Sequence, residues 1–158
     1  MKIGIRVEGL DKVLKNLNSR IKGIEGATKQ GLIAAGMYIL HQSQLKVPVR
    51  YGNLRASGYV VWKESQSIDG RFQEDPAGKE KVDIARLEQN LAEETADMRG
   101  KVSRGTMVGV GYAAWYAFFV HEVQAAHQGG RTWKFLENAI KENVGTILKI
   151  ISNRARAA

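Results

Sequence analysis

Residues 27–46 read ATKQGLIAAGMYILHQSQLK, and this stretch decides the fold of the chain. It contains no proline, and its middle, residues 32–40, is apolar almost all the way round. A helix of this kind is usually buried on more than one side. Gly31 and Gly36 cost helix stability relative to alanine, so they suggest that a strand or another helix comes close. Either glycine alone is also explained by simple tolerance. We therefore predict a central helix over this stretch.

Two stretches that follow the central helix have the residue types of β-strands. Pro48 and the pair Gly52-Asn53 predict that the chain leaves the helix and reverses direction. Residues 59–62 and 106–112 are rich in β-branched and aromatic residues, which predicts two strands.

The second of these strands has two different faces. Large side chains occupy one face, and small or flexible ones occupy the other. The large ones are Val108, Val110 and Tyr112, and the others are Met107, Gly109 and Gly111. A row of small side chains lets a helix lie close against a sheet, so we predict that a helix covers this face.

Both ends of the chain have regular apolar patterns. Residues 2–7 alternate apolar and polar side chains, which predicts a half-buried strand or an extended arm. Residues 10–24 have apolar side chains at helical spacing and predict a first amphipathic helix. Residues 132–156 form the clearest helix. Its apolar stripe consists of Phe135, Leu136, Ala139, Ile140, Val144, Ile147, Leu148 and Ile151.

The segment 63–104 lies between the two predicted strands and differs from its surroundings. Residues 63–78 are polar and predict a long loop, and a peripheral helix is expected from about residue 79 to residue 99. The apolar stripe of that helix consists of Ile84, Leu87, Leu91 and Met98. Such a stripe needs an apolar surface to cover, and we hypothesise that residues 79–99 form an assembly arm that docks outside its own domain.

These elements predict the α+β class. We expect one domain over residues 1–158, with a small, mostly antiparallel sheet packed against the central helix and the long C-terminal helix. Residues 63–104 are an insertion, consisting of a loop and an amphipathic helix, within that domain. The most apolar stretch, residues 112–120, is far shorter than the roughly 18 residues of a membrane span, so we expect a soluble protein.

The chain carries a net charge of +8, and this charge is unevenly placed. Acidic residues outnumber basic ones in the segment 63–104, whereas the rest of the chain is basic. Excess positive charge favours an acidic partner, such as nucleic acid or an acidic protein surface. Arg50 and Arg55 are candidates for contact with DNA or with an acidic neighbour. A solvated basic surface without a partner is the alternative.

The residues of known catalytic and metal sites are not found in their usual patterns. The chain has no cysteine, and His121, Glu122 and His127 have the wrong spacing for a helical zinc site. No serine lies in a strand-to-helix elbow, and the glycines near Gly109 lack the rest of a dinucleotide-binding loop. We expect no catalytic residue, no metal and no cofactor.

Three short blocks of sequence carry a resemblance. In the first, Val47–Ser57, the residues Pro48, Gly52, Leu54, Arg55 and Ser57 match the pattern Pro-x-x-Thr-Gly-x-Leu-Arg-x-Ser, with Tyr51 in place of threonine. The second block contains Tyr112, Ala113, Tyr116, Val120, His121 and Glu122, and the third contains Phe135 and Leu136. In this order, the blocks resemble the phage tail-component family of lambdoid siphophages, also called the minor capsid, neck or tail-completion family.

The resemblance implies a non-enzymatic structural protein of the virion, made and assembled in the cytoplasm of the bacterial host. It implies a ring-forming subunit of the head-to-tail connector, or of the tail-completion or terminator complex. The expected partners are further copies of the chain, with six favoured and twelve possible, and the neighbouring connector, portal or tail-tube proteins. DNA in the lumen of the ring is a further candidate, and no membrane is expected.

Two further hypotheses come from the residues. The aromatic segment with Tyr112, Trp115, Tyr116, Phe118 and Phe119 is a candidate interface anchor, because such residues are enriched at interface centres. Core packing is the alternative for most of them. A basic nucleic-acid-binding module is the alternative function, and a salt-dependent affinity for free duplex would distinguish it from a ring subunit.

Overall fold

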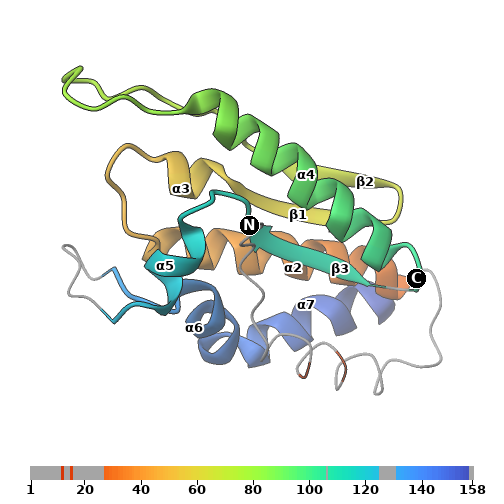
Figure 1. Ribbon diagram of the computed structural model, residues 1–158. Helices are drawn as coiled ribbons and strands as arrows, with labels where there is room; N and C mark the ends of the chain where they lie inside the picture. The colour runs from red at the N-terminus through yellow and green to blue at the C-terminus, as the bar shows by residue number, and fades with distance from the viewer. Residues whose placement is uncertain (1–11, 13–14, 16–26, 106, 125–130, 157–158) are drawn as a thin grey trace.

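The computed structural model describes residues 12, 15, 27–105, 107–124 and 131–156 (Figure 1). The predictions for residues 2–7 and 10–24 therefore lie outside the described residues, apart from Lys12 and Lys15. The elements in chain order are α2 (Ala27–Lys46), α3 (Asn53–Ala56), β1 (Gly58–Trp62), β2 (Ser65–Ile68), α4 (Ile84–Val102), β3 (Val108–Tyr112), α5 (Ala117–Glu122), α6 (Phe135–Glu142) and α7 (Val144–Arg156). The predicted α+β class is confirmed, and the central helix has the predicted bounds.

The sheet has three antiparallel strands in the order β2-β1-β3. In the middle strand, Val60 pairs with Ser67 on one side and with Val110 on the other. Strand β2 corrects the prediction of a loop over residues 63–78. The sequence does not reveal this strand, because an edge strand that is largely in water can be polar and SQSI has no apolar alternation.

Helix α2 covers one face of the sheet, and its glycines explain how close it lies. A methyl group added to Gly36 would lie 2.9 Å from Cγ1 of Val108 and 3.1 Å from Cγ1 of Val60. On the other side of α2, a methyl group on Gly31 would lie 3.0 Å from Cα of Ile151 in α7. The two glycines thus let a strand and a helix approach α2, as the sequence indicated.

Helix α4 covers the opposite face of the sheet, where Tyr59 and Val61 of β1 pack against Leu91. The helix begins at Ile84 rather than near residue 79, because the side chain of Asp83 accepts a hydrogen bond from the backbone N–H of Arg86 at 3.0 Å and caps it. It also continues to Val102.

The apolar stripe of α4 belongs to the core of the chain itself. Leu87 is 2% exposed and Leu91 is 6% exposed, and Met98 packs against the cluster that contains Leu91. Ile84 is half-buried at the start of the helix. The hypothesis of an assembly arm that docks outside its own domain is therefore wrong, because Leu87, Leu91 and Met98 are already packed in the core clusters of the chain itself.

The C-terminal helical segment is confirmed, and Asn143 divides it into α6 and α7. The side chain of Asn143 donates a hydrogen bond to the carbonyl of Ala139 and accepts one from the hydroxyl of Tyr38, at 2.8 and 3.0 Å. The break changes the phase of the apolar stripe. Val144 and Leu148 are consequently exposed, although the sequence placed them with the buried residues.

No helix in the described ranges combines the length and apolar character needed to cross a bilayer.

The contact between α4 and β3 leads to a stability prediction. A methyl group on Gly109 would lie 2.5 Å from Sδ of Met98 and closer still to its Cγ. We expect Gly109→Ala to lower the free energy of unfolding by about 1–3 kcal/mol in urea denaturation, because the Met98 side chain or α4 would have to shift. Gly100→Ala, also at α4, is the matched control. No atom lies within 4 Å of its added methyl group, so we expect a gain of up to about 1 kcal/mol. Equal effects of the two changes would contradict this packing.

Candidate interaction groove

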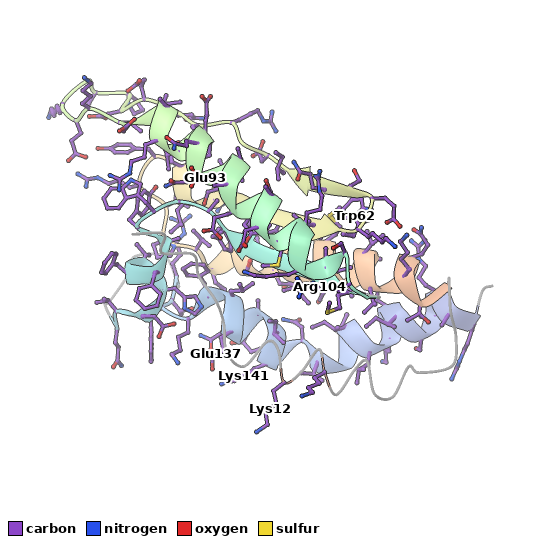
Figure 2. The ribbon with its side chains drawn as sticks, turned by 45° about the vertical axis from the view of Figure 1, so that its right-hand side comes forward. Lys12, Trp62, Glu93, Arg104, Glu137 and Lys141 are labelled. Carbon is purple, nitrogen blue, oxygen red and sulfur yellow. The ribbon has the colours of Figure 1, made fainter. Side chains whose placement is uncertain are left out.

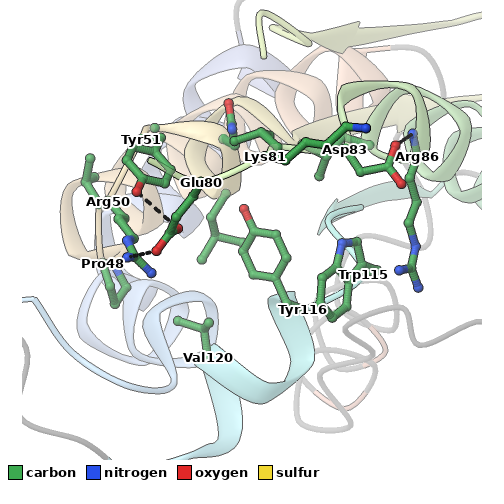
Figure 3. Close-up of a pocket in the computed structure, with 16 residues that line it drawn as sticks. Pro48, Arg50, Tyr51, Glu80, Lys81, Asp83, Arg86, Trp115, Tyr116 and Val120 are labelled. Atoms are coloured by element: carbon green, nitrogen blue, oxygen red, sulfur yellow. Dashed lines mark hydrogen bonds and ion pairs between the residues drawn. The ribbon is translucent and has the colours of Figure 1, made fainter. Parts of the chain in front are cut away.

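A groove with a volume of about 720 Å³ lies between three segments that are far apart in the sequence (Figure 3). Residues 48–54 form one wall, residues 80–87 form a second, and residues 115–120 form the third. Together they supply apolar, aromatic and charged side chains. Clefts of this size, with an apolar lining and a few polar groups, are typical binding sites.

The first wall is the turn that follows α2. Gly52 has a φ of 82°, a left-handed conformation that favours glycine, and it begins the short helix α3. The buried Asn53 fixes the turn to the loop that follows β2. Its side-chain amide donates to the carbonyl of Gln73 at 2.8 Å, and its side-chain oxygen accepts from the N–H of Gln73 at 2.7 Å.

The second wall depends on the buried carboxylate of Asp75. This carboxylate accepts the backbone N–H groups of Ala77, Lys79 and Glu80 at 2.9, 2.8 and 2.9 Å. These hydrogen bonds, that from Ala77 first, hold the pKa of Asp75 below its ordinary value. The loop is thereby folded so that Glu80 faces the first wall.

Charged and hydroxyl groups join these two walls. Arg50 forms an ion pair with Glu80, and the hydroxyl of Tyr51 donates to the same carboxylate at 3.1 Å (Figure 3). The negative charge of Glu80 raises the pKa of Arg50. Because the Arg50 side chain is largely in water, this ion pair orients the groove walls more than it stabilises the fold.

The third wall is aromatic. Trp115 and Tyr116 come just before α5, and Val120 lies within it. The guanidinium of Arg86 lies over the ring of Trp115, 4.5 Å from its centroid, which is a cation–π contact. Trp115 and Tyr116 make an edge-to-face pair at 5.2 Å. Burial raises the pKa of the Tyr116 hydroxyl. Figure 3 shows this Tyr116 ring between Glu80 and Trp115.

Beside the groove lies an aromatic patch, defined here as Trp115, Phe118, Phe119 and Val123. Their exposed fractions are 41%, 39%, 51% and 55%, respectively. Phe118 and Phe119 pack edge to face at 5.9 Å, but neither is buried by the described part of the chain. Of the aromatic segment singled out in the sequence, Tyr112 is in the core, whereas these tryptophan and phenylalanine side chains are on the surface.

The residues that carry the family resemblance are brought together around this site. The N–H of Ala113 donates to the carbonyl of Ser57 at 3.0 Å, which joins the first two blocks. The ring of Phe135 contacts the rings of Tyr112 and His121, with centroids 5.1 and 4.9 Å apart. These contacts join the third block to the second. The motif residues that line the groove are Pro48, Gly52, Leu54, Tyr116 and Val120. Of the remaining ones, Tyr112, Phe135 and Leu136 belong to the main core cluster, whereas Glu122 is exposed.

The two arginines expected to face DNA or an acidic partner differ in their surroundings. Arg50 is exposed but paired with Glu80. Arg55 is half-buried, and its Nε is shielded from water without a hydrogen-bond partner among the described residues. They do not form a shared basic surface.

The histidine cluster is only partly described, because His127 lies outside the described residues. His121 is fully buried, and its Nδ1 lies 2.7 Å from a carboxylate oxygen of Glu122. In the described ranges, no three histidine, aspartate or glutamate side chains are grouped so that they could hold a metal ion.

Comparisons with family models, curated proteins and solved structures found no match to this chain. Function is therefore inferred from the sequence blocks, the groove, the aromatic patch and the distribution of charge.

Proposed function

We propose that this protein is a structural subunit of a tailed bacteriophage virion, and that it assembles into a ring at the head-to-tail junction or at the end of the tail. The neighbours in this proposal are other copies of the chain and the adjoining connector, portal or tail-tube proteins. A ring of six is favoured and a ring of twelve is the alternative. The resemblance of the sequence blocks supports the family, and the first two blocks supply residues to one groove, which supports a shared role for them.

The observation that carries the proposal is the aromatic patch beside the groove. Trp115, Phe118 and Phe119 expose large apolar surfaces at the edge of a hollow that is itself partly apolar. Contiguous apolar surface on a folded protein typically marks a site of protein association. Aromatic residues and arginine are enriched in such interfaces, and Arg86 stacked on Trp115 fits that composition.

The small sheet gives further support. Strands β2 and β3 each pair with β1 on one side, and the sheet contains no further strand among the described residues. Sheet edges are usually covered or paired. Contacts between different surfaces of neighbouring copies can protect such edges, and they close into a ring when the rotation between copies is suitable.

The first test is the mass of the purified protein, measured by light scattering and by native mass spectrometry. The proposal predicts a closed oligomer of six or twelve copies, visible as rings by electron microscopy, alone or on purified tail or head particles. A protein that stays monomeric or dimeric and is absent from purified virions would contradict it.

The alternative, a basic nucleic-acid-binding module, is favoured by one observation. Helix α7 carries Lys149, Arg154 and Arg156, and the chain has no acidic residue from 143 to 156. That alternative predicts a monomer or dimer whose affinity for free duplex falls steeply with salt.

A further inference from the structure

The end of the molecule opposite the groove gathers positive charge. The start of α2, the β1–β2 turn, the end of α4 and the end of α7 lie together there (Figure 1). We define the basic end as Lys29, Lys63, Arg99, Lys101, Arg104, Arg154 and Arg156. Arg104 lies at the same end as Trp62, the last residue of β1 (Figure 2). Arg154 is placed there because its Cβ would lie 3.4 Å from a methyl group on Gly31.

Three of these cations surround a recess. Lys29, Lys63 and Arg104 line a hollow of about 340 Å³ together with Glu64 and Ser103. The three basic side chains come from a helix start, a hairpin turn and a helix end, so only the folded chain brings them together.

The positive charge of the basic end is only partly compensated. Glu64 pairs with Lys29, and Asp97 pairs with Lys101. Lys63, Arg104, Arg154 and Arg156 form no ion pair with any residue in the described ranges. Glu64 and Asp97 are therefore too few to neutralise the surface.

Helix dipoles account for some of these residues. Four of them lie in the last turns of α4 and α7, where a cation is favoured: Arg99, Lys101, Arg154 and Arg156. The same effect disfavours Lys29, which lies in the first turn of α2, and it does not apply to Lys63 on a hairpin turn. A local structural reason thus covers only part of the cluster.

The composition of this end fits nucleic acid better than protein. Among the described residues, Met107 is the one large apolar side chain that lines the recess. The groove, by contrast, has Trp115 and the neighbouring phenylalanines. Protein–DNA interfaces are more polar and much more positively charged than protein–protein interfaces.

We propose that the basic end binds the phosphate backbone of double-stranded DNA, with Lys63 and Arg104 as direct phosphate contacts. This inference rests on the proposed function in one respect, since a connector ring encloses the DNA that leaves the head. Lys63 and Arg104 thus replace Arg50 and Arg55 as the candidate DNA contacts, because Arg50 is paired with Glu80 and Arg55 is half-buried. Contacts of this kind are independent of base sequence.

The test uses the full chain and a fluorescent duplex of arbitrary sequence, with affinity measured over a range of salt concentrations. The variant Lys63→Gln with Arg104→Gln removes two of the proposed phosphate contacts. The slope of log affinity against log salt should then become shallower by about two. Arg71→Gln with Lys79→Gln removes the same charge from the exposed loop near the groove, and its slope should match the unchanged protein.

The outcomes separate this inference from the proposed function. Equal slopes for both double variants and the unchanged protein, or no binding of duplex by the unchanged protein, would overturn the inference. Light scattering on the same samples reports assembly independently. A monomer that nevertheless loses DNA affinity selectively with Lys63→Gln and Arg104→Gln would retain the inference and overturn the ring. A ring in which Lys63→Gln with Arg104→Gln causes no selective loss of DNA affinity would support the proposed function and overturn the inference.

Discussion

Deleting residues 66–101 and joining β1 to β3 through a short turn is expected to yield a protein that aggregates or unfolds without a cooperative transition. The deletion removes most of β2 and nearly all of α4. Tyr59 and Val61, now 2% and 0% exposed, would then face water. Loss of a buried leucine alone costs about 2–5 kcal/mol, and small domains are stable by only about 5–15 kcal/mol. Circular dichroism and thermal melting would measure the loss.

Point variants test the same packing without changing the chain length. Leu87→Ala should lower the free energy of unfolding by about 2–5 kcal/mol, since Leu87 is buried in the main core cluster. Glu88→Ala is the matched control on the exposed side of α4 and should change it by less than about 0.5 kcal/mol. If the deleted protein melts cooperatively and Leu87→Ala has no effect, α4 does not belong to the core.

The apolar pattern of α4 illustrates how far sequence reasoning reaches. A stripe at helical spacing indicates that a helix buries one face, and Leu87 and Leu91 are indeed buried. The pattern does not say which surface covers that face. Leu91 and Met98 pack against the face of strands β1 and β3 where Gly109 makes room for Met98, whereas Leu87 packs in the main core cluster. The small side chain of Gly109 indicates that a helix lies close to it, but the sequence pattern does not identify that helix as α4.

Residues 27–46 and 132–156 show that the sequence predicts a long helix well but does not predict a break that depends on a distant contact. The central helix was predicted at its observed bounds because a long apolar run without proline has few alternatives. The break at Asn143 depends on hydrogen bonds to Ala139 and to Tyr38, which is far away in the sequence. A contact of this kind does not change the spacing of apolar residues, so the sequence pattern does not predict the break.

The sequence singles out residues of two of the three groove walls. The first and third walls coincide with the sequence blocks that carry the family resemblance, so Pro48 and Tyr116 were singled out. The second wall, with Glu80 and Arg86, lies in the segment for which the sequence predicts an assembly arm, because its partners Arg50 and Trp115 are about 30 residues away in the chain. The turn around Asp75 had a sequence signal, since an Asp-Pro pair followed by glycine is typical of tight turns.

The two ends of the molecule suggest how a ring subunit would divide its contacts. Apolar and aromatic side chains gather with the groove, whereas the basic end carries uncompensated cations and one large apolar side chain at its recess. In this view, neighbouring proteins meet at the groove, and phosphate meets the other end. The two surfaces can be changed separately, because the residues that line the groove and those that line the recess do not overlap.

Replacing Phe118 and Phe119 together with glutamate is expected to abolish assembly while leaving the subunit folded. Both side chains are already partly in water, at 39% and 51% exposure, so thermal melting should change little. Aromatic anchors at the centre of an interface commonly contribute about 2 kcal/mol or more each, and burying two carboxylates in their place adds a further cost. The dissociation constant should therefore rise by about a thousandfold or more, as measured by light scattering over a dilution series.

Leu45→Glu is the control, since Leu45 is 58% exposed on α2 and lies outside the aromatic patch. Rings that persist in the double variant, or that are lost equally in the control, would show that the patch is not the contact between subunits.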